Sequence, residues 1–324
     1  MIPRRPFLAL AASALLAPPA PASSAEAEAE MPTGEWDFTG LVAFGDSLSD
    51  MGNRWLDPTR ADMDKKFRQT WVARLAGPQM LNFPGFKPSG TTLFYGGSNY
   101  AVGGAGTEAT VTLTSDRNLN QHLTQQISKR YLSPDFNTAG VQKEALHVVV
   151  IGANDIMRAS IGPAQLITQW AGMEQAGQAV ARSTEGQIRA LAQAGVRHVL
   201  WGNIFDVGRT PAVTHRAQAL PSMTKTYLAA VTKGVLAHNA EMEAAIARLA
   251  QAHPALKITK LDLHACFEAM EADPAKYGFI NVTTGADDTQ HLFSSDGLHP
   301  TPQGHKVLAD YAFAMLKTAR RGAE

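Results

Sequence analysis

The chain has 324 residues, of which 45% are hydrophobic and 18% are charged. This composition is typical of a globular protein with one large apolar core. The 29 Lys and Arg residues balance the 29 Asp and Glu residues, so the formal net charge is zero. Surfaces that bind nucleic acid need an excess of basic residues, and the composition therefore argues against a nucleic-acid partner.

The N-terminal 25 residues have the layout of a secretory signal peptide. Arg4 and Arg5 precede a short apolar run, residues 7–17, and small residues follow up to Ala25. A membrane anchor needs roughly 20 apolar residues, which is more than this run supplies. A mitochondrial presequence is disfavoured by the acidic stretch that follows. We therefore expect cleavage after Ala25 and export, to the periplasm or the medium.

Residues 39–322 are expected to form a single domain, preceded by a disordered stretch over residues 26–38. The one cysteine, Cys266, cannot form a disulfide within the chain, so the core must be stable without a covalent cross-link. Cys266 follows an expected strand and lacks the context of a cysteine nucleophile. It is interpreted as a small buried side chain.

Segments with strand and helix patterns alternate along this domain. Strands are expected at residues 40–44, 147–151, 198–204 and 257–263, with a weaker candidate at 80–83. Helices are expected at residues 165–194, 223–252 and 302–320. Continuous apolar runs are typical of strands that are buried on both faces of a parallel sheet. The alternation therefore predicts an α/β fold, a three-layer α/β/α sandwich with a mainly parallel sheet.

Ser47 lies in the run Gly45-Asp-Ser-Leu-Ser-Asp50, directly after the first expected strand. At this place its hydroxyl would stand at the carboxyl edge of the sheet, where ligand sites of such folds gather. A serine hydroxyl becomes a good nucleophile only when a base removes its proton during attack. By itself the run is a weak signal, because a plain turn has the same composition.

A base and its partner are found near the C-terminus. In Ser-Asp296-Gly-Leu-His299-Pro an aspartate precedes a histidine by three residues, so Asp296 can accept the Nδ1 proton of His299. The Nε2 atom of His299 would then face Ser47. His291 has Asp288 at the same spacing and is the internal competitor, although no helix begins directly after it.

The acidic residues of this region offer a metal site as the alternative. The candidate ligands are Asp287, Asp288, His291 and Asp296. Their spacing matches no strong zinc or calcium pattern, so a solvated acidic loop is the preferred interpretation and no metal is expected.

Acyl transfer also requires hydrogen-bond donors that stabilise an oxyanion. The glycine-rich run 99–106 can bring a bare backbone N–H close to a substrate. Asn154, in Gly-Ala-Asn-Asp155 after the second strand, would hold its side-chain amide at the same sheet edge. The structural alternatives are a glycine-rich turn and a helix cap.

These four segments together resemble the SGNH, or GDSL-type, hydrolase family. They occur in the family's order and extend over about residues 41–300. The longer forms, GDSLSDMGN from Gly45 and NIFDVGRTP from Asn203, resemble its bacterial branch of secreted phospholipases, lecithinases, haemolysins and short-chain esterases. The resemblance implies a flavodoxin-like sheet, no cofactor, and ester hydrolysis through an acyl-enzyme.

The resemblance also implies a role for each matching residue. Ser47 is the nucleophile and donates its backbone N–H to the oxyanion. His299 is the general base and then the general acid, and Asp296 orients it. Two further oxyanion donors are implied, the Asn154 side chain and the Gly104 backbone, with Gly103 as the alternative to Gly104.

The substrate is expected to be a small-molecule ester or a lipid, with a transient contact at a membrane surface in the second case. Acyltransferase, carbohydrate acetylesterase and non-catalytic binding module are the alternatives. Several apolar residues within the irregular, glycine-rich segment 85–114 either line an acyl pocket or pack in the core. They are Phe86, Leu93, Phe94, Tyr95 and Tyr100.

Overall fold

The strands expected from the sequence form one parallel sheet in the computed structural model of the chain. The structure describes residues 36–55, 70–90, 94, 96–108, 121–160 and 170–321. The expected signal peptide and its cleavage site lie outside these residues, as does most of the 26–38 stretch. Residues 34–324 belong to one compact unit.

The sheet has four strands in the order β1-β2-β3-β4. They are β1 (Leu41–Gly45), β2 (Leu146–Val150), β3 (His198–Gly202) and β4 (Lys257–Leu261). All neighbours are parallel, and the first residues of the four strands lie in register. Each strand begins within one residue of its predicted start, and the last two end two residues earlier than predicted.

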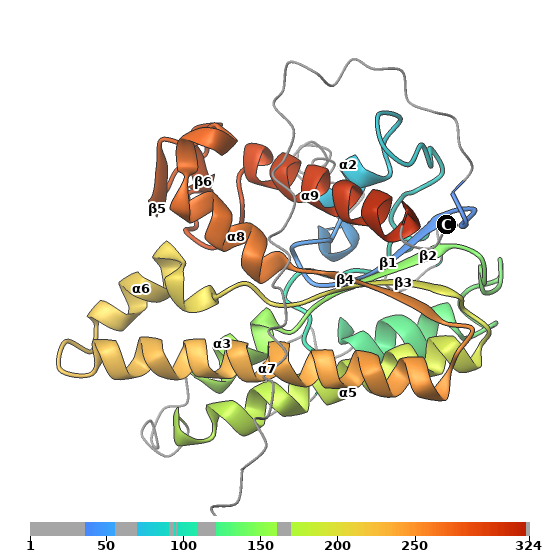
Figure 1. Ribbon diagram of the computed structural model, residues 1–324, viewed down its shortest axis with the longest axis horizontal. Coiled ribbons are helices and arrows are strands. Elements are labelled where there is room, and N and C mark those ends of the chain that lie inside the picture. Colours follow the sequence, from blue (N-terminus) through green and yellow to red (C-terminus); the bar gives the residue numbers. More distant parts are fainter. Residues whose placement is uncertain are drawn as a thin grey trace, which may run out of the picture. The chain divides into compact units, whose positions relative to one another are not determined.

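Helices cover both faces of this sheet, as Figure 1 shows. On one face lie α2 (Trp71–Leu75) and α9 (Pro302–Arg321), and on the other lie α3 (Ala153–Ala159), α5 (Met173–Gln193) and α7 (Thr224–Ala252). Two more helices follow β3 and β4, α6 (Pro211–Gln218) and α8 (Leu263–Ala272). The predicted three-layer α/β/α class is confirmed.

Alternate residues of β1 join different parts of the core. Leu41 and Ala43 belong to the apolar cluster that includes Trp71 of α2 and Leu308 of α9. Val42 and Phe44 belong to the cluster that includes Ile188 of α5, Met242 of α7 and their neighbours. Side chains of successive strand residues point to opposite faces, so a strand that is apolar throughout is covered on both sides.

The helix α5 ends shortly before Gly195, as the sequence predicts. The N–H of Gly195 donates to the Ala192 carbonyl, and the N–H of Val196 donates to the Leu191 carbonyl. These two bonds make a Schellman motif, which satisfies the last carbonyls of the helix. The predicted start at residue 165 lies outside the described residues, and α5 itself begins at Met173.

The weak strand predicted at residues 80–83 is wrong. The backbone N–H of Leu81 donates to the Leu75 carbonyl, and that of Phe83 donates to the Ala76 carbonyl. The segment therefore turns back on the end of α2 instead of entering the sheet. The apolar side chains of this segment led to the strand prediction. Leu81 is buried in the cluster that includes residues of α2, and a buried turn needs apolar side chains as a strand does.

Three of the apolar residues proposed for the acyl pocket lie among the described residues, and all three pack in the core. Tyr100 stacks on Phe44 with ring centroids 5.5 Å apart. Phe86 is buried in the cluster of α2, and Phe94 packs against the other cluster. Leu93 and Tyr95 lie outside the described residues.

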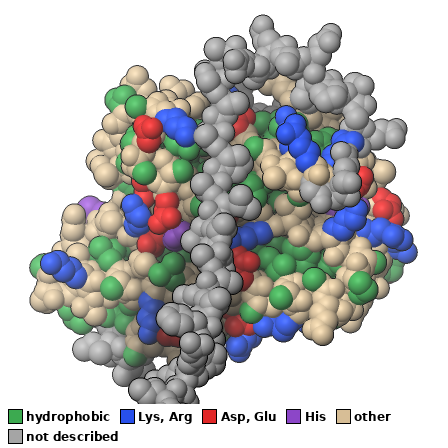
Figure 2. Space-filling model, in the orientation of Figure 1, with side chains coloured by type: hydrophobic (Ala, Val, Ile, Leu, Met, Phe, Trp, Pro, Cys, Tyr) green, Lys and Arg blue, Asp and Glu red, His purple; other side chains and the backbone are tan. Residues whose placement is uncertain are grey.

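Charged side chains of both signs are interspersed over the described part of the face in Figure 2. Such mixing agrees with the balanced composition. Among the helices of the described ranges, none combines the length and apolarity needed to cross a bilayer.

Two short strands precede the last helix. They are β5 (Asn281–Gly285) and β6 (His291–Phe293), which pair in parallel. The loop between β6 and α9 is closed by the N–H of Ser294, which donates to the His299 carbonyl at 2.8 Å. This loop carries Asp296 and His299 toward the carboxyl edge of the main sheet.

Candidate active site

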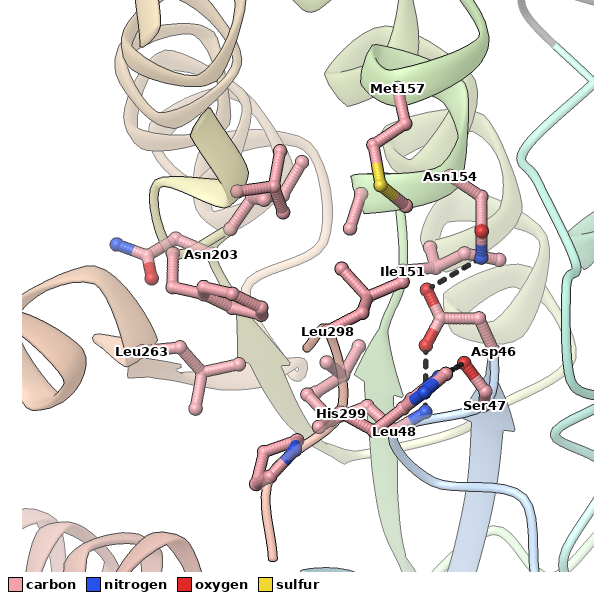
Figure 3. Close-up of a pocket in the computed structure, with 16 residues that line it drawn as sticks. Asp46, Ser47, Leu48, Ile151, Asn154, Met157, Asn203, Leu263, Leu298 and His299 are labelled. Atoms are coloured by element: carbon pink, nitrogen blue, oxygen red, sulfur yellow. Dashed lines mark hydrogen bonds between the residues drawn. The ribbon is translucent and has the colours of Figure 1, made fainter. Parts of the chain in front are cut away.

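Ser47, His299 and Asp296 form one hydrogen-bonded chain at that sheet edge. Ser47 Oγ lies 2.6 Å from His299 Nε2, and His299 Nδ1 lies 2.6 Å from Asp296 Oδ2. Figure 3 shows the first of these contacts. An ionised carboxylate only accepts hydrogen bonds, so His299 carries its proton on Nδ1 and accepts the Ser47 hydroxyl proton at Nε2.

Asp296 is held as a carboxylate by its own loop. Its Oδ1 atom accepts the backbone N–H groups of Leu298 and His299, both at 2.9 Å, and the Ser294 hydroxyl at 3.0 Å. Burial acts to raise the pKa of Asp296, but the bonds and charge of His299 and the Leu298 N–H outweigh it and hold the pKa below its usual range. The partner of His299 is therefore ionised at neutral pH.

The turn that presents Ser47 is folded by Asp46. Its carbonyl accepts the N–H groups of Ser49 and Asp50, and its Oδ1 accepts the N–H of Leu48 at 3.0 Å. Gly45 precedes this turn with a φ of +151°, and a Cβ there would lie 2.1 Å from the Val150 carbonyl oxygen. Only glycine lets β1 end this close to β2.

Gln126 holds the same strand end from the other side, and the sequence analysis missed it. Its amide accepts the N–H of Gly45 at 2.8 Å and donates to the carbonyl of Gly45 at 2.7 Å. It stands in a π-helical segment, Gln125–Tyr131, and its side chain is fully buried. The side-chain amide thereby takes the place of a neighbouring strand two residues before Ser47.

Asn154 lies opposite Ser47, in the first turn of α3. Its side-chain amide donates to the Ala105 carbonyl at 3.0 Å and lies 3.4 Å from Asp46 Oδ2. Figure 3 shows the Asn154 nitrogen beside Asp46. The second contact is long for a hydrogen bond, so that N–H can be redirected when a stronger acceptor arrives.

The two glycines considered as oxyanion donors differ in their hydrogen bonds. The N–H of Gly103 donates to Asp50 Oδ2 at 2.7 Å and is therefore engaged. The N–H groups of Gly104 and Ser47 donate to no acceptor among the described residues. This difference favours Gly104 over Gly103 as a donor.

Two arginines bind the two peptide groups that flank the Cα atom of Gly104. Arg54 Nη1 donates to the Gly103 carbonyl at 3.0 Å, and Arg158 Nη2 donates to the Gly104 carbonyl. In a trans peptide the C=O and N–H point in opposite directions. By holding the Gly103 carbonyl, Arg54 fixes the direction of the Gly104 N–H.

Asp46 adds a second carboxyl group close to the reactive residues. It is 5% exposed, and burial raises its pKa from 3.8 to about 6. The bond from the Leu48 N–H and the charge on His299 oppose this rise without cancelling it. Near neutral pH this carboxyl group therefore titrates within the site.

The structure separates the two His-Asp pairs that the sequence left in competition. His291 Nδ1 lies 2.8 Å from Asp288 Oδ2, so this second pair also forms. It stands at the start of β6, and Ser47 makes its contact with His299 instead. The Cys266 thiol is buried, which raises its pKa to about 12, in agreement with a packing role.

A pocket opens beside Ser47 and runs across the carboxyl edge of the sheet (Figure 3). Residues after all four strands contribute to it: Ser47 after β1, Ile151 after β2, Phe205 after β3 and Leu263 after β4. Most of its remaining lining is apolar. The candidate nucleophile therefore stands at one end of an apolar pocket.

Comparison with known proteins places the chain in a family. Residues 41–312 match the family described as GDSL-like Lipase/Acylhydrolase. The chain is similar to Lipase 1 of Photorhabdus luminescens, with 24% identity over 88% of this chain and 51% of that protein. It is also similar to an uncharacterized protein in the trpE-trpG intergenic region of Pseudomonas putida, with 27% identity over 86% of this chain and 48% of that protein.

The chain spans about half the length of these curated relatives. The family match, by contrast, begins with β1 and ends within α9, so it takes in the whole sheet and every candidate site residue. The chain therefore belongs to the family of GDSL-like lipases and acylhydrolases.

Proposed function

We propose that this protein hydrolyses small-molecule carboxylic esters through an acyl-enzyme formed on Ser47. The proposal rests on one observation above the others, the hydrogen-bonded chain from Ser47 through His299 to Asp296. Family membership supports the same reaction class. Where the ester is a lipid, we propose a transient contact with a lipid surface.

In the acylation step, Ser47 Oγ attacks the ester carbonyl carbon while His299 Nε2 takes the hydroxyl proton. The carbonyl oxygen becomes an oxyanion, which accepts hydrogen bonds from the Ser47 and Gly104 N–H groups and the Asn154 amide. The imidazolium of His299 is stabilised by the Asp296 carboxylate. It then gives its proton to the alcohol oxygen as the carbon–oxygen bond breaks.

Deacylation repeats these events with water in place of the serine. His299 Nε2 removes a proton from a water molecule, which attacks the carbonyl carbon of the acyl-enzyme. The same donors hold the second oxyanion. Collapse of this intermediate returns the proton to Ser47 and releases the carboxylic acid.

Replacement of the nucleophile tests the proposal directly. We expect Ser47→Ala to lower kcat/KM for a p-nitrophenyl ester by about 10⁴-fold, since the acyl-enzyme cannot form. A fluorophosphonate probe should label the wild type on Ser47, located by peptide mass spectrometry. Ser128→Ala is a matched control, because that hydroxyl bonds Gln187 away from the site. Labelling of Ser47→Ala, or retained turnover, would refute the proposal.

The two His-Asp pairs provide a second comparison. We expect His299→Ala to lower kcat by about 10³-fold or more, because the serine loses its base. His291→Ala removes a similar Nδ1–carboxylate contact, 2.8 Å long, and should leave kcat within about twofold. Steady-state kinetics on the two purified variants decides between the pairs, and equal losses would contradict the assignment of His299.

We also propose that residues 1–25 direct export. The arrangement of Arg4, Arg5 and the apolar run is what supports it. Expression of the full chain in a bacterial host should yield extracytoplasmic protein whose intact mass is that of a chain beginning at Glu26. Replacing Arg4 and Arg5 with glutamate is expected to retain the uncut chain in the cells. A cytoplasmic, uncut wild type would contradict the proposal.

A further inference from the structure

We propose that the apolar pocket beside Ser47 holds the acyl chain and selects medium-length chains of about eight carbons, with Leu263 forming its inner end. This inference rests on the proposed ester hydrolysis and adds the substrate class. It is argued from the lining of the pocket, its direction along the sheet and its burial.

The direction of the pocket follows from the strand order. Ser47 comes directly after β1, at one edge of the sheet, and Leu263 begins α8 after β4, at the other edge. Figure 3 agrees, since Ser47 and Leu263 lie at opposite sides of the view with Leu298 and Ile151 between them. A chain attached to Ser47 therefore extends across the ends of β2 and β3.

The inner end of the pocket is apolar and is lined by buried side chains. Phe205, Val207 and Leu263 are each at most 7% exposed. The Phe205 ring stacks on Phe267 with centroids 4.0 Å apart, which supports this wall from behind. Methylene groups that reach it leave water completely, and this is the condition under which they contribute most to binding.

The side-chain nitrogen and oxygen of Asn203, the polar residue at this end, are both hydrogen-bonded within the protein. Asn203 Nδ2 donates to Asp262 Oδ1 at 2.7 Å, and Asn203 Oδ1 accepts the His264 N–H at 2.9 Å. A hydroxyl of a sugar or a hydroxylated chain would lose its hydration here beside polar atoms that are already engaged. The pocket therefore favours a plain hydrocarbon chain over an acetylated carbohydrate.

The acyl side of the ester suits this chamber better than the alcohol side. The acyl group stays bound to Ser47 through both steps, whereas the alcohol must leave before water reaches His299 Nε2. A group in the buried part of the pocket stays bound, whereas a group at the open mouth can leave and be replaced by water. The residues of the mouth, Met157, Leu298 and His299, are partly exposed, in contrast to the inner wall.

The length follows from the geometry of the sheet. Three strand spacings of ~4.8 Å separate β1 from β4, which makes ~14 Å. A chain's last methyl group stops ~4 Å short of the far wall at van der Waals contact, leaving ~10 Å. An extended chain advances ~1.2 Å per bond, so the space accommodates about eight carbons.

A series of p-nitrophenyl esters from acetate to palmitate, kept below their micelle-forming concentrations, tests the inference. Each buried CH₂ is expected to raise kcat/KM by up to about fourfold, so the four CH₂ groups added from butanoate to octanoate should raise it by at least about tenfold and at most about 250-fold. The value should fall again at dodecanoate. Constant kcat/KM across the series, or a maximum at acetate, would overturn the inference.

Substitutions in the inner wall give a second test. It uses the ratio of two kcat/KM values, which does not depend on the fraction of the protein that is folded. Leu263→Ala should raise the ratio of dodecanoate to octanoate kcat/KM at least about fivefold, since a longer chain then fits. Leu236→Ala is the matched control, because Leu236 on α7 is 51% exposed. An unchanged ratio in Leu263→Ala would overturn the role of this wall.

A second series distinguishes the two sides of the ester. Octanoate esters of methanol, butanol and octanol should differ in kcat/KM by less than about threefold. A larger effect of the alcohol than of the acyl chain would assign the chamber to the alcohol and overturn the inference. Fluorophosphonate labelling of Ser47 is scored beside both series, because its loss refutes the proposed reaction, whereas its retention with constant kcat/KM refutes only the chamber.

Discussion

Arg54 helps to hold one peptide group beside the candidate site. Its guanidinium donates to the Gly103 carbonyl at 3.0 Å, and its own backbone N–H donates to Asp50 Oδ2. The Gly103 N–H donates to the same carboxylate. Glycine peptides turn easily, so the direction of the Gly104 N–H depends on these contacts. Arg54 is thus a positioning residue for the proposed oxyanion site.

We expect Arg54→Met to lower kcat about tenfold while KM changes by less than about twofold, because the Gly104 N–H is used only in the transition state. Arg54→Lys keeps a donor and should recover part of kcat. Steady-state kinetics with one p-nitrophenyl ester measures both. Arg74→Met, which removes a guanidinium from α2, serves as the control. A loss confined to thermal stability, with kcat unchanged, would speak against this role.

At the scale of elements, the end of β1 is held by a side chain from the segment Gln125–Tyr131. Gln126 bonds both backbone groups of Gly45, and the two residues are 81 positions apart. Their pairing fixes where β1 stops and the Asp46 turn begins. The position of Ser47 therefore depends on an element that contains no reactive group.

We expect Gln126→Leu to lower the free energy of unfolding by about 1–3 kcal/mol, because it leaves the buried N–H of Gly45 without a partner and removes one of the two donors to the Gly45 carbonyl. Urea unfolding followed by circular dichroism measures the change. Gln125→Leu, on the same turn but only partly buried, should cost less than about 1 kcal/mol. Equal effects of the two substitutions would contradict the pairing with Gly45.

At the scale of the whole molecule, two carboxyl groups give the stability opposite dependences on pH. Asp46 has a higher pKa in the folded protein, about 6, than the ordinary 3.8. Its contribution is complete below about pH 4 and is lost as the pH rises through 6. Asp296 has a lowered pKa, so its contribution is present above about pH 4 and is lost as the pH falls.

We expect the wild type to lose about 2 kcal/mol of unfolding free energy between pH 4 and pH 6 through Asp46, since one pKa unit corresponds to about 1.4 kcal/mol and the folded carboxyl is still half protonated at pH 6. Asp46→Asn cannot ionise and should lack this loss. Urea unfolding at a series of pH values measures the difference between the two slopes. Asp135→Asn, at an exposed position, controls for the removal of a carboxylate. Parallel slopes for wild type and Asp46→Asn would contradict the expectation.

The sheet could be predicted from the sequence because its signals are local. A strand such as Leu41–Gly45 is apolar throughout, and Gly195 marks the end of α5 within the same short segment. The segment at residues 80–83 is also apolar, but its backbone pairs with the end of α2. Apolar composition reports burial, and it distinguishes a strand from a buried turn only when a longer pattern is present.

The motifs of the candidate site could be predicted from the sequence, but the residues that hold those motifs in position could not. Asp288 precedes His291 as Asp296 precedes His299, and both pairs form. Only the fold decides which Nε2 meets a serine. Gln126 could not be found, because no sequence pattern links it to a glycine 81 residues away.

The two outer strands of the sheet differ in how their free sides are occupied. Beyond β1, the backbone of residues 98–102 bonds Ala43 and the carbonyl of Gly45, and Gln126 bonds the same carbonyl and the Gly45 N–H. At the other edge, β4 carries Lys257 and Lys260, paired with acidic neighbours. Open strand edges invite pairing with other chains, and charged or covered edges resist it. The contacts that hold Ser47 in place therefore also protect the strand that precedes it from edge-to-edge aggregation.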